Sequence, residues 1–221
     1  MGKIRTVLFD LDGTLADTAL DLAAAVNYLR DQQGLPPLPY EALRPVASHG
    51  TKAMLRRGLG LTPESDEYED YRDRFLERYF SHICDETRLF PGMEDVIDSV
   101  EQRGYNWGVV TNKPSRLTDP LMVELGLSER AMTIVSSDTC GHAKPHPAPM
   151  RYAAKQCESA PEECLYIGDA ARDIEAGRVV DMPTLVALWG YLDPDEDYPE
   201  DWGADGMIEQ PSNILDWLDK H

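Results

Sequence analysis

Short apolar runs alternate along this chain with longer segments in which apolar residues recur every three or four positions. The runs are almost continuously apolar, which is typical of strands in a parallel sheet covered by helices on both faces. The longer segments have the spacing and length of helices that connect parallel strands. We therefore predict a doubly wound α/β fold. The predicted strands cover residues 4–10, 105–112, 132–138, 164–169 and 183–190, with a short edge strand at 206–210, and the predicted helices cover 92–103, 114–125, 147–157 and 171–180.

The stretch from residue 18 to residue 84 interrupts this alternation, because it carries helical patterns and no convincing strand. Two helix faces are predicted there, and a Pro-rich connection at 34–45 joins them. The faces consist of Leu22, Ala25, Val26 and Leu29 in the first and of Tyr68, Tyr71, Phe75, Tyr79 and Ile83 in the second. We predict a small all-helical module formed by residues 18–84, inserted into a core formed by residues 1–17 and 85–221.

Polar residues follow four of the predicted strands, at the point where each strand ends. Because the carboxyl ends of parallel strands meet at one edge of a sheet, these residues are expected to share one crevice. The polar residues are Asp10 and Asp12 after the first strand, Thr111 and Asn112 after the second, Lys144 after the third, and Asp169 and Asp173 after the fourth. Gly13, beside Asp12, would let the backbone pass close to a ligand in this crevice.

Four carboxylates gathered in one crevice repel one another unless some are protonated or a cation holds them. Oxygen ligands without histidine or cysteine suit a hard cation, and Mg²⁺ fits best. A magnesium ion together with Lys144 and the Thr111 hydroxyl would make a receptor for a phosphoryl group. The crevice is therefore expected to bind a phosphate ester.

A carboxylate beside a bound phosphoryl group is a plausible nucleophile, since aspartate can form an acyl-phosphate intermediate. We assign this role to Asp10. Asp12, two positions further, would point to the same side if the strand continued through it. It could then protonate the leaving alkoxide and later activate water as general acid and base.

The charge of the chain limits the possible partners. The formal net charge is −19, so nucleic acid and anionic membranes are not expected to bind. The N-terminus resembles no secretory signal, and the four cysteines form no C-x-x-C pair. We expect reduced thiols, a cytoplasmic location and a small-molecule partner, with the chain a monomer or a weak homodimer.

The segments FDLDGTLADT, VVTNK, AKPHP and YIGDAARDIEAG resemble the four ordered motifs of the haloacid dehalogenase-like hydrolase superfamily. The resemblance implies a Mg²⁺-dependent enzyme in which Asp10 is the nucleophile and Asp12 the acid and base. It implies that Thr111 and Lys144 bind the phosphoryl oxygens, with Asn112 beside them. It also implies Mg²⁺ ligands from Asp10, the Asp12 carbonyl and Asp169, with Asp173 a ligand through water or a partner of Lys144. Dehalogenases of the superfamily lack the second aspartate, so Asp12 indicates a phosphatase.

The helical module at 18–84 resembles the small helical cap of this superfamily, and we call it the cap. The loop at 48–55 resembles the cap loop that reaches the leaving group, which implies substrate contacts from Ser48, His49, Gly50, Thr51 or Lys52. Ser48 or Thr51 could instead cap the next helix, and Asp17 or Thr18 could cap the first cap helix. Asp138 could cap or brace a turn. His142 and His146 lie four residues apart, but Pro145 and Pro147 disfavour a helical zinc pair.

Within the superfamily the chain resembles the phosphoglycolate phosphatase branch. The segments WGVVTNKP, Gly190–Tyr191 and DWGAD are similar to N-acetylmuramic acid 6-phosphate phosphatases of peptidoglycan recycling. The resemblance therefore implies N-acetylmuramic acid 6-phosphate or 2-phosphoglycolate as substrate. A phosphosugar mutase of the same superfamily would share the core residues. A receiver-type signalling module, which also pairs a phosphorylated aspartate with Mg²⁺, is a remote alternative.

Overall fold

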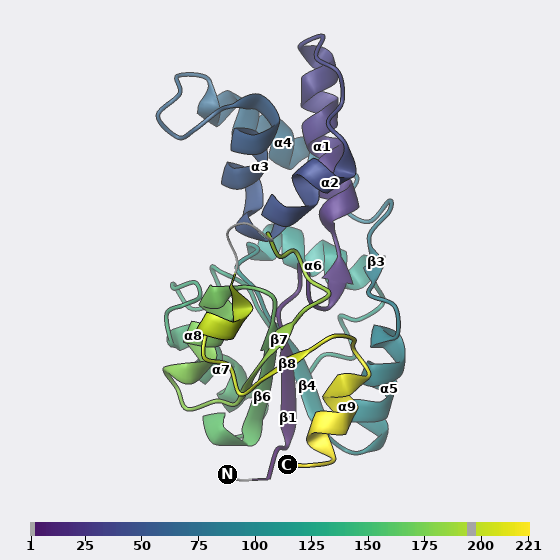
Figure 1. Ribbon diagram of the computed structural model, residues 1–221, viewed down its shortest axis with the longest axis vertical. Coiled ribbons are helices and arrows are strands. Elements are labelled where there is room, and N and C mark those ends of the chain that lie inside the picture. Colours follow the sequence, from purple (N-terminus) through teal and green to yellow (C-terminus); the bar gives the residue numbers. More distant parts are fainter. Residues whose placement is uncertain (1–2, 194–197) are drawn as a thin grey trace.

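Six parallel strands form one sheet at the centre of the larger part of the molecule (Figure 1). The computed structural model describes residues 3–193 and 198–221. The strand order is β5-β4-β1-β6-β7-β8, so the first strand lies inside the sheet with later strands on both sides. The strands are β1 (Thr6–Phe9), β4 (Asn106–Val110), β5 (Thr133–Val135), β6 (Cys164–Gly168), β7 (Thr184–Ala187) and β8 (Gly206–Ile208).

Helices cover both faces of this sheet, which explains why its strands are almost continuously apolar. One face packs against α5 (Met93–Gln102), α6 (Ser115–Glu124) and α9 (Asn213–Leu218). The other packs against α7 (Ala148–Gln156) and α8 (Ala171–Arg178). The doubly wound α/β prediction is confirmed, and the edge strand at 206–210 is observed as β8.

A group of helices stands above the sheet in Figure 1 and comes from the chain between β2 and β3. Its core is built by apolar faces of α1 and α4, which contain the two predicted helix faces. Ile83 is buried with them but lies just beyond the end of α4. The elements are α1 (Ala19–Gln32), α2 (Tyr40–Leu43), a 3₁₀ turn (Arg44–His49), α3 (Gly50–Leu59) and α4 (Tyr68–Ser81).

The sequence did not predict the two-stranded antiparallel ribbon at the base of these helices. It joins β2 (Ala16–Asp17) to β3 (Arg88–Leu89), where the chain leaves the core and returns to it. Asp21 on α1 is buried and accepts hydrogen bonds from the backbone N–H groups of Glu86 and Thr87. The two crossings of the chain are therefore held side by side. The cap boundaries at residues 18 and 84 stay a prediction.

The start of α1 also differs from expectation. Thr18 occupies the N-cap position, but its hydroxyl donates to Asp12 Oδ1 at 2.6 Å and does not cap the helix. The hydroxyl of Tyr191 accepts the backbone N–H groups of Thr18 and Ala19 at 2.6 and 2.9 Å, and donates to Asp17 Oδ1 at 2.8 Å. The capping prediction for Asp17 or Thr18 is wrong, because a distant tyrosine supplies the acceptor.

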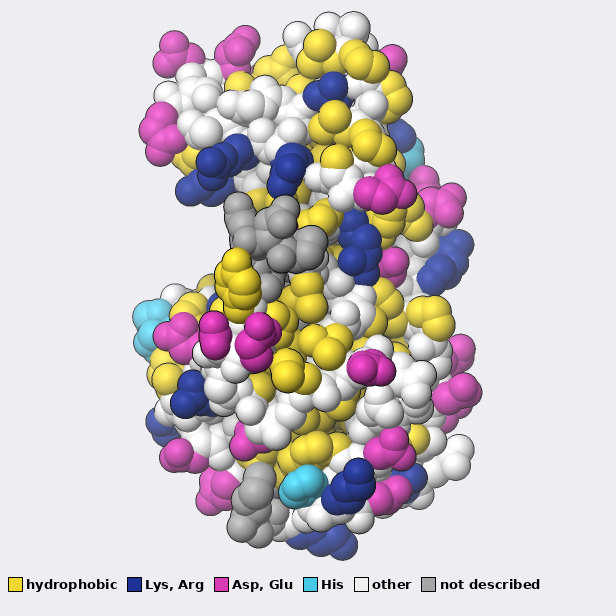
Figure 2. Space-filling view, viewed as in Figure 1, with side chains coloured by type: hydrophobic (Ala, Val, Ile, Leu, Met, Phe, Trp, Pro, Cys, Tyr) yellow, Lys and Arg dark blue, Asp and Glu magenta, His cyan; other side chains and the backbone are white. Residues whose placement is uncertain are grey.

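The surface and the thiols complete the description. Acidic side chains are spread over both parts of the face in Figure 2, and Lys and Arg side chains lie along the lower border of the cap there. All four cysteines are free. In the described part of the chain, no helix has both the length and the apolar character that a membrane crossing requires. The acidic segment 191–205 is rich in turn formers and is therefore predicted to be a surface loop; its residues 194–197 lie outside the described residues.

Candidate active site

The loop after β1 places the first two aspartates. The strand ends at Phe9, and the chain turns at once: the N–H of Leu15 bonds to the Asp10 carbonyl, and the N–H of Ala16 to the Leu11 carbonyl. The sequence analysis placed Asp10 and Asp12 on the same side only if the strand continued through Asp12, and the strand does not continue. The turn, with its backbone hydrogen bonds, sets the separation of the two carboxylates.

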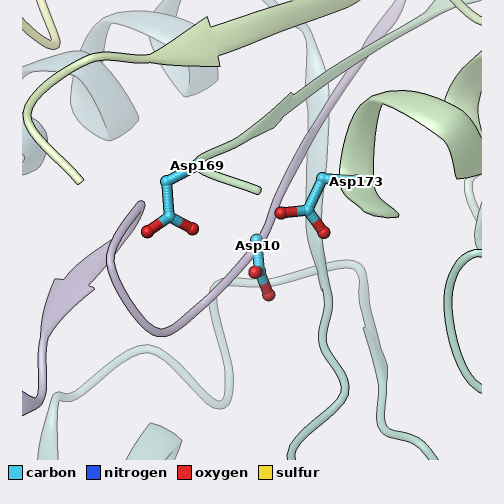
Figure 3. A group of neighbouring side chains, drawn as sticks. All are labelled: Asp10, Asp169 and Asp173. Atoms are coloured by element: carbon cyan, nitrogen blue, oxygen red, sulfur yellow. The ribbon is translucent and has the colours of Figure 1, made fainter. Parts of the chain in front are cut away.

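Three buried carboxylates converge at the carboxyl ends of β1 and β6. Asp10, Asp169 and Asp173 are at most 3% exposed, and each offers an oxygen within 4.8 Å of the others. Figure 3 shows the three side chains turned toward a common space. Such a group requires a compensating cation or bound protons, because like charges in a buried site repel strongly.

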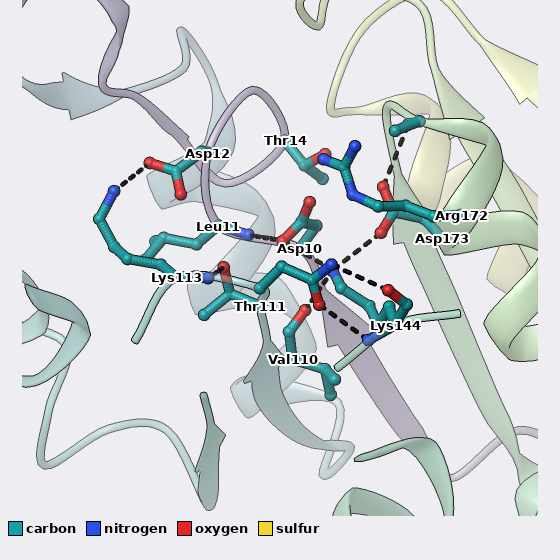
Figure 4. A network of polar contacts seen from close by, with 12 residues as sticks. Asp10, Leu11, Asp12, Thr14, Val110, Thr111, Lys113, Lys144, Arg172 and Asp173 are labelled. Atoms are coloured by element: carbon teal, nitrogen blue, oxygen red, sulfur yellow. Dashed lines mark hydrogen bonds and ion pairs between the residues drawn. The ribbon is translucent and has the colours of Figure 1, made fainter. Parts of the chain in front are cut away.

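Lys144 supplies one compensating charge. Its ammonium lies 2.9 Å from Asp10 Oδ1 and 2.8 Å from Asp173 Oδ1, and its side chain is fully buried (Figure 4). It also donates to the Val110 carbonyl and to the hydroxyl of Tyr166, each within 2.8 Å. Asp173 is therefore a direct partner of Lys144, which is one of the two roles expected for it.

Asp169 is held by backbone groups that approach it closely. A Cβ atom on Gly13, whose φ is +87°, would lie 2.1 Å from Asp169 Oδ2, and one on Gly190 would lie 2.2 Å from its Cβ. The N–H of Tyr191 donates to Oδ2 at 2.8 Å. Gly13 thus makes room for a carboxylate of the site, which requires a residue without a side chain.

The environment raises the pKa of two of these carboxyls. Burial, together with the charge of Asp173, raises the pKa of Asp10 to about 6, although Lys144 opposes the shift. Burial, followed by the charges of Asp10 and Asp173, raises the pKa of Asp169 to about 7. One lysine therefore does not offset the cost of keeping three carboxylates ionised inside the protein.

These shifts predict how stability depends on pH when a chelator is present. The folded protein holds protons on Asp10 and Asp169 that the unfolded chain releases near pH 3.8. The free energy of unfolding should therefore fall as the pH rises from about 4 to about 7. Thermal melts at several pH values, with EDTA, measure this slope. Asp169→Asn should flatten it, whereas an equal slope in that variant would contradict the assignment.

The segment after β4 lies on the other side of Asp10. Thr111 is buried, and its hydroxyl accepts the backbone N–H of Lys113 at 3.1 Å. The side-chain amide of Asn112 makes two bonds with the backbone of Lys144, at 2.8 and 2.9 Å. Asn112 thereby fixes the loop that carries Lys144.

Lys113 is a buried cation that sequence reasoning missed. Its ammonium lies 2.6 Å from Asp12 Oδ1, and its side chain is only 6% exposed (Figure 4). It also lies 4.9 Å from the centre of the Tyr79 ring on α4. Asp12 is thus bound by Lys113 and by Thr18, and the lysine connects it to the cap.

A cavity of about 370 Å³ opens between the cap and these residues. Ser48, His49, Gly50 and Thr51 from the predicted cap loop line it, as do Asp10, Asp12, Thr111 and Asn112. Lys52 does not: it lines a second cavity of about 740 Å³ with Arg56 and Arg57.

Ser48 reaches the carboxylate site itself. Its hydroxyl donates to Asp169 Oδ2 at 2.9 Å, and its carbonyl accepts a hydrogen bond from Arg172 at 2.8 Å. Neither Ser48 nor Thr51 caps α3, since His49 stands at the N-cap and makes no side-chain capping bond. The capping alternative for this loop is wrong, and the loop joins the cap to the core.

Asp138 and the pair of His142 and His146 were the remaining candidates from the sequence, and their contacts lie within the core. Asp138 accepts the backbone N–H of Ser115 at 3.0 Å and its hydroxyl at 2.8 Å, so it braces the start of α6. The rings of His142 and His146 stack with centres 3.8 Å apart in a segment that is not helical.

Besides Lys113, three residues at the site escaped the sequence analysis as contributors. They are Tyr166 in β6, Arg172 in α8 and Tyr191 after β7. Each of the three has a polar group at the end of its side chain and lies in or next to an apolar or motif segment. The sequence therefore indicates that this group forms a buried hydrogen bond, but it does not identify the partner.

The donor set fits a hard divalent cation. The three carboxylates offer oxygen only, the group contains no histidine or cysteine, and burial leaves its charge undercompensated. Asp10, Asp169 and Asp173 are therefore the residues that could hold Mg²⁺.

The profile of the haloacid dehalogenase-like hydrolase family matches residues 7–187. The chain belongs to this family. An N-acetylmuramic acid 6-phosphate phosphatase of Pseudomonas aeruginosa is 40% identical over 218 residues, which cover 99% of this chain and 96% of that protein. A phosphoglycolate phosphatase of Xanthomonas campestris pv. campestris is 41% identical over 210 residues, covering 95% and 94%. The family resemblance seen in the motifs is thereby confirmed.

The fold of this hydrolase also matches solved structures. A protein of Haemophilus somnus, described as a predicted phosphoglycolate phosphatase, superposes with a TM-score of 0.85 at 24% identity. The match covers 98% of this chain and 99% of that chain. At this identity the similarity establishes the fold of the hydrolase family, with its parallel sheet and helices.

Proposed function

We propose that this hydrolase is a Mg²⁺-dependent phosphatase that acts on a small phosphate monoester through an aspartyl-phosphate on Asp10. The observation that carries the proposal is the position of Asp10. Its carboxylate lies beside Lys144 and two further carboxylates, and it lines a cavity that Asp12 also lines. The proposed nucleophile and the proposed acid thus line one pocket, and a buried cation lies beside the nucleophile.

In the first step, an oxygen of Asp10 bonds to phosphorus while the ester oxygen leaves. Leu11 N–H and Lys144 bind Asp10 Oδ1 and so orient the carboxylate. Asp12 gives its proton to the leaving oxygen, so an alcohol departs. The phosphoryl oxygens would bind to Thr111, which lines the cavity, and to Lys144, whose ammonium lies 2.9 Å from Asp10 Oδ1.

In the second step, Asp12 takes a proton from water, and the water oxygen bonds to phosphorus. The bond between Asp10 and phosphorus breaks, which restores the carboxylate and releases inorganic phosphate. Mg²⁺, when bound, would neutralise the charge that accumulates between the carboxylate and the phosphoryl oxygens. The cap, proposed as residues 18–84, excludes water from the cavity during the first step.

The relatives suggest two substrates. Those described above are named for N-acetylmuramic acid 6-phosphate and for phosphoglycolate, at nearly equal identity. We propose that one of these two esters is the substrate. The hydrogen bonds of Tyr191, within the Gly190–Tyr191 segment, are made to Asp169 and to the start of α1, so they do not favour either ester.

A phosphate-release screen tests the proposal. It should include both esters, hexose phosphates and nucleotides, each with Mg²⁺ and without any bisphosphate. We expect one carboxylic acid ester to give the highest kcat/KM. Transfer of the phosphoryl group back to the sugar, dependent on a bisphosphate, would indicate a mutase instead.

Removing the metal should stop turnover. EDTA is expected to reduce phosphate release to background, and added Mg²⁺ to restore it, because the carboxylate group lacks sufficient positive charge without it. Ca²⁺ should inhibit, since it accepts looser and more numerous ligands. Undiminished activity in EDTA would exclude the metal assignment.

A further inference from the structure

Two hydrogen-bond donors of the cavity have no obvious role in the proposed chemistry. Tyr79 on α4 is 1% exposed and lines the cavity; its buried hydroxyl makes no hydrogen bond of ordinary geometry with the described residues, and the charged group that acts on it most strongly is the Lys113 ammonium. A buried polar atom without a partner costs free energy, so such atoms are rare in folded proteins. In a binding cavity, an unpaired hydroxyl of this kind is available to a ligand.

Lys113 is the second donor. Its ammonium lies against the Tyr79 ring and 2.6 Å from Asp12, the only carboxylate with which it forms an ion pair in the described chain. Burial alone would lower the pKa of Lys113, but Asp12 and Tyr79 raise it above its ordinary value. Burial raises the pKa of Tyr79 to about 12. Near neutral pH, Lys113 is therefore charged and Tyr79 carries its proton.

The pair lies where the leaving group of an ester bound at Asp10 would extend. Tyr79 belongs to α4, Lys113 contacts its ring, and both line the cavity that Asp10 and Asp12 line. An ammonium has three N–H donors, and the ion pair with Asp12 uses one of them. Arg172 also lines the cavity, and its buried Nε has no partner among the described residues. Its charge, however, lies next to the three buried carboxylates, at the phosphoryl end of the cavity.

We propose that Lys113 and Tyr79 form a subsite for a carboxylate on the leaving group of the substrate. The two donors match the two oxygens of a carboxylate, one as a charged and one as a neutral hydrogen bond. The subsite selects phosphate esters of carboxylic acids over esters of neutral alcohols. The inference rests on the proposed function, and both proposed substrates are carboxylic acids.

Paired substrates test this subsite. N-acetylmuramic acid 6-phosphate is compared with N-acetylglucosamine 6-phosphate, which lacks the acid group, and 2-phosphoglycolate with 2-hydroxyethyl phosphate. The readout is the ratio of kcat/KM for acid over neutral ester. We expect a ratio on the order of 10² in the unaltered protein for at least one pair, because a site built for a polar group rejects the analogue without it. A ratio near one for both pairs would overturn the proposal.

Two variants then locate the selectivity. Lys113→Met should reduce the ratio to below about 10, and Tyr79→Phe should reduce it by about 10-fold. Because Lys113 also contacts Asp12, both substrates should lose rate in its variant, but the ratio isolates the carboxylate contact. If kcat/KM fell equally for the acid and the neutral ester, the ratio would stay unchanged. Lys113 would then only position Asp12, and the proposal of a carboxylate subsite would be overturned.

Stability and a control complete the test. Tyr79→Phe removes one unpaired buried oxygen, so its melting temperature should equal or exceed that of the unaltered protein while its ratio falls. Lys155→Gln, an exposed lysine on α7, is the control and should leave the ratio unchanged. Absence of turnover on every ester would instead contradict the proposed function. A loss of ratio in Lys155→Gln would show that overall charge, and not this subsite, sets the preference.

Discussion

Asp10→Asn is expected to reduce phosphate release by at least about 10⁴-fold, since the loss of a nucleophile removes the covalent path altogether. The amide oxygen can still accept the hydrogen bonds of Leu11 and Lys144, so the fold should persist. In EDTA the variant should melt at a higher temperature than the unaltered protein. The reason is that one of three mutually repelling buried carboxylates has been removed.

The measurements are steady-state phosphate release on the preferred ester and thermal melts with and without Mg²⁺. Acid-quench mass spectrometry of the unaltered protein should find the phosphoryl group on the peptide containing residue 10. Asp119→Asn, an exposed aspartate on α6, is the matched control and should change neither rate nor stability. Phosphoryl label on another residue, or a variant that keeps its rate, would refute the role of Asp10.

Asp12→Asn is expected to reduce turnover of alkyl phosphates by about 10²- to 10⁴-fold, the usual contribution of a general acid and base. The loss should be smaller in the first step for p-nitrophenyl phosphate, whose leaving group needs no proton. Asparagine is preferred to alanine because its oxygen still accepts hydrogen bonds from Thr18 and Lys113.

Rapid-quench kinetics distinguish the two roles of Asp12. With p-nitrophenyl phosphate, the variant should release a burst of nitrophenol and accumulate phosphorylated Asp10, since water is no longer activated. Equal losses on both leaving groups, with no burst, would contradict the acid and base assignment. They would point to a purely structural role for the bond between Asp12 and Lys113.

The order of strands and helices could be predicted because each element carries its own periodicity. The convergence of Asp10, Asp169 and Lys144 could be predicted because parallel strands end at one edge of the sheet. The β2–β3 ribbon could not be predicted, since strands of two residues have no detectable period.

The contacts around Asp12 could not be predicted either, because they depend on tertiary structure. The prediction for Asp12 assumed a straight strand, but the chain turns after Phe9. Lys113 pairs with a carboxylate 101 positions earlier in the sequence, and Tyr191 binds a helix start more than 170 positions earlier. No local pattern contains such distant pairs, so only the folded chain could supply them.

Tyr191 has a consequence for how this molecule could evolve. Its hydroxyl secures the first turn of α1, while its backbone N–H secures Asp169. Any movement of the cap about residues 17–18 therefore affects Tyr191, the residue that also orients Asp169, a carboxylate that we propose as a Mg²⁺ ligand. Insertions or deletions between β7 and Tyr191 would disturb the first turn of α1 and the carboxylate together, so we expect this short connection to tolerate fewer changes in length than the outer turns of the cap.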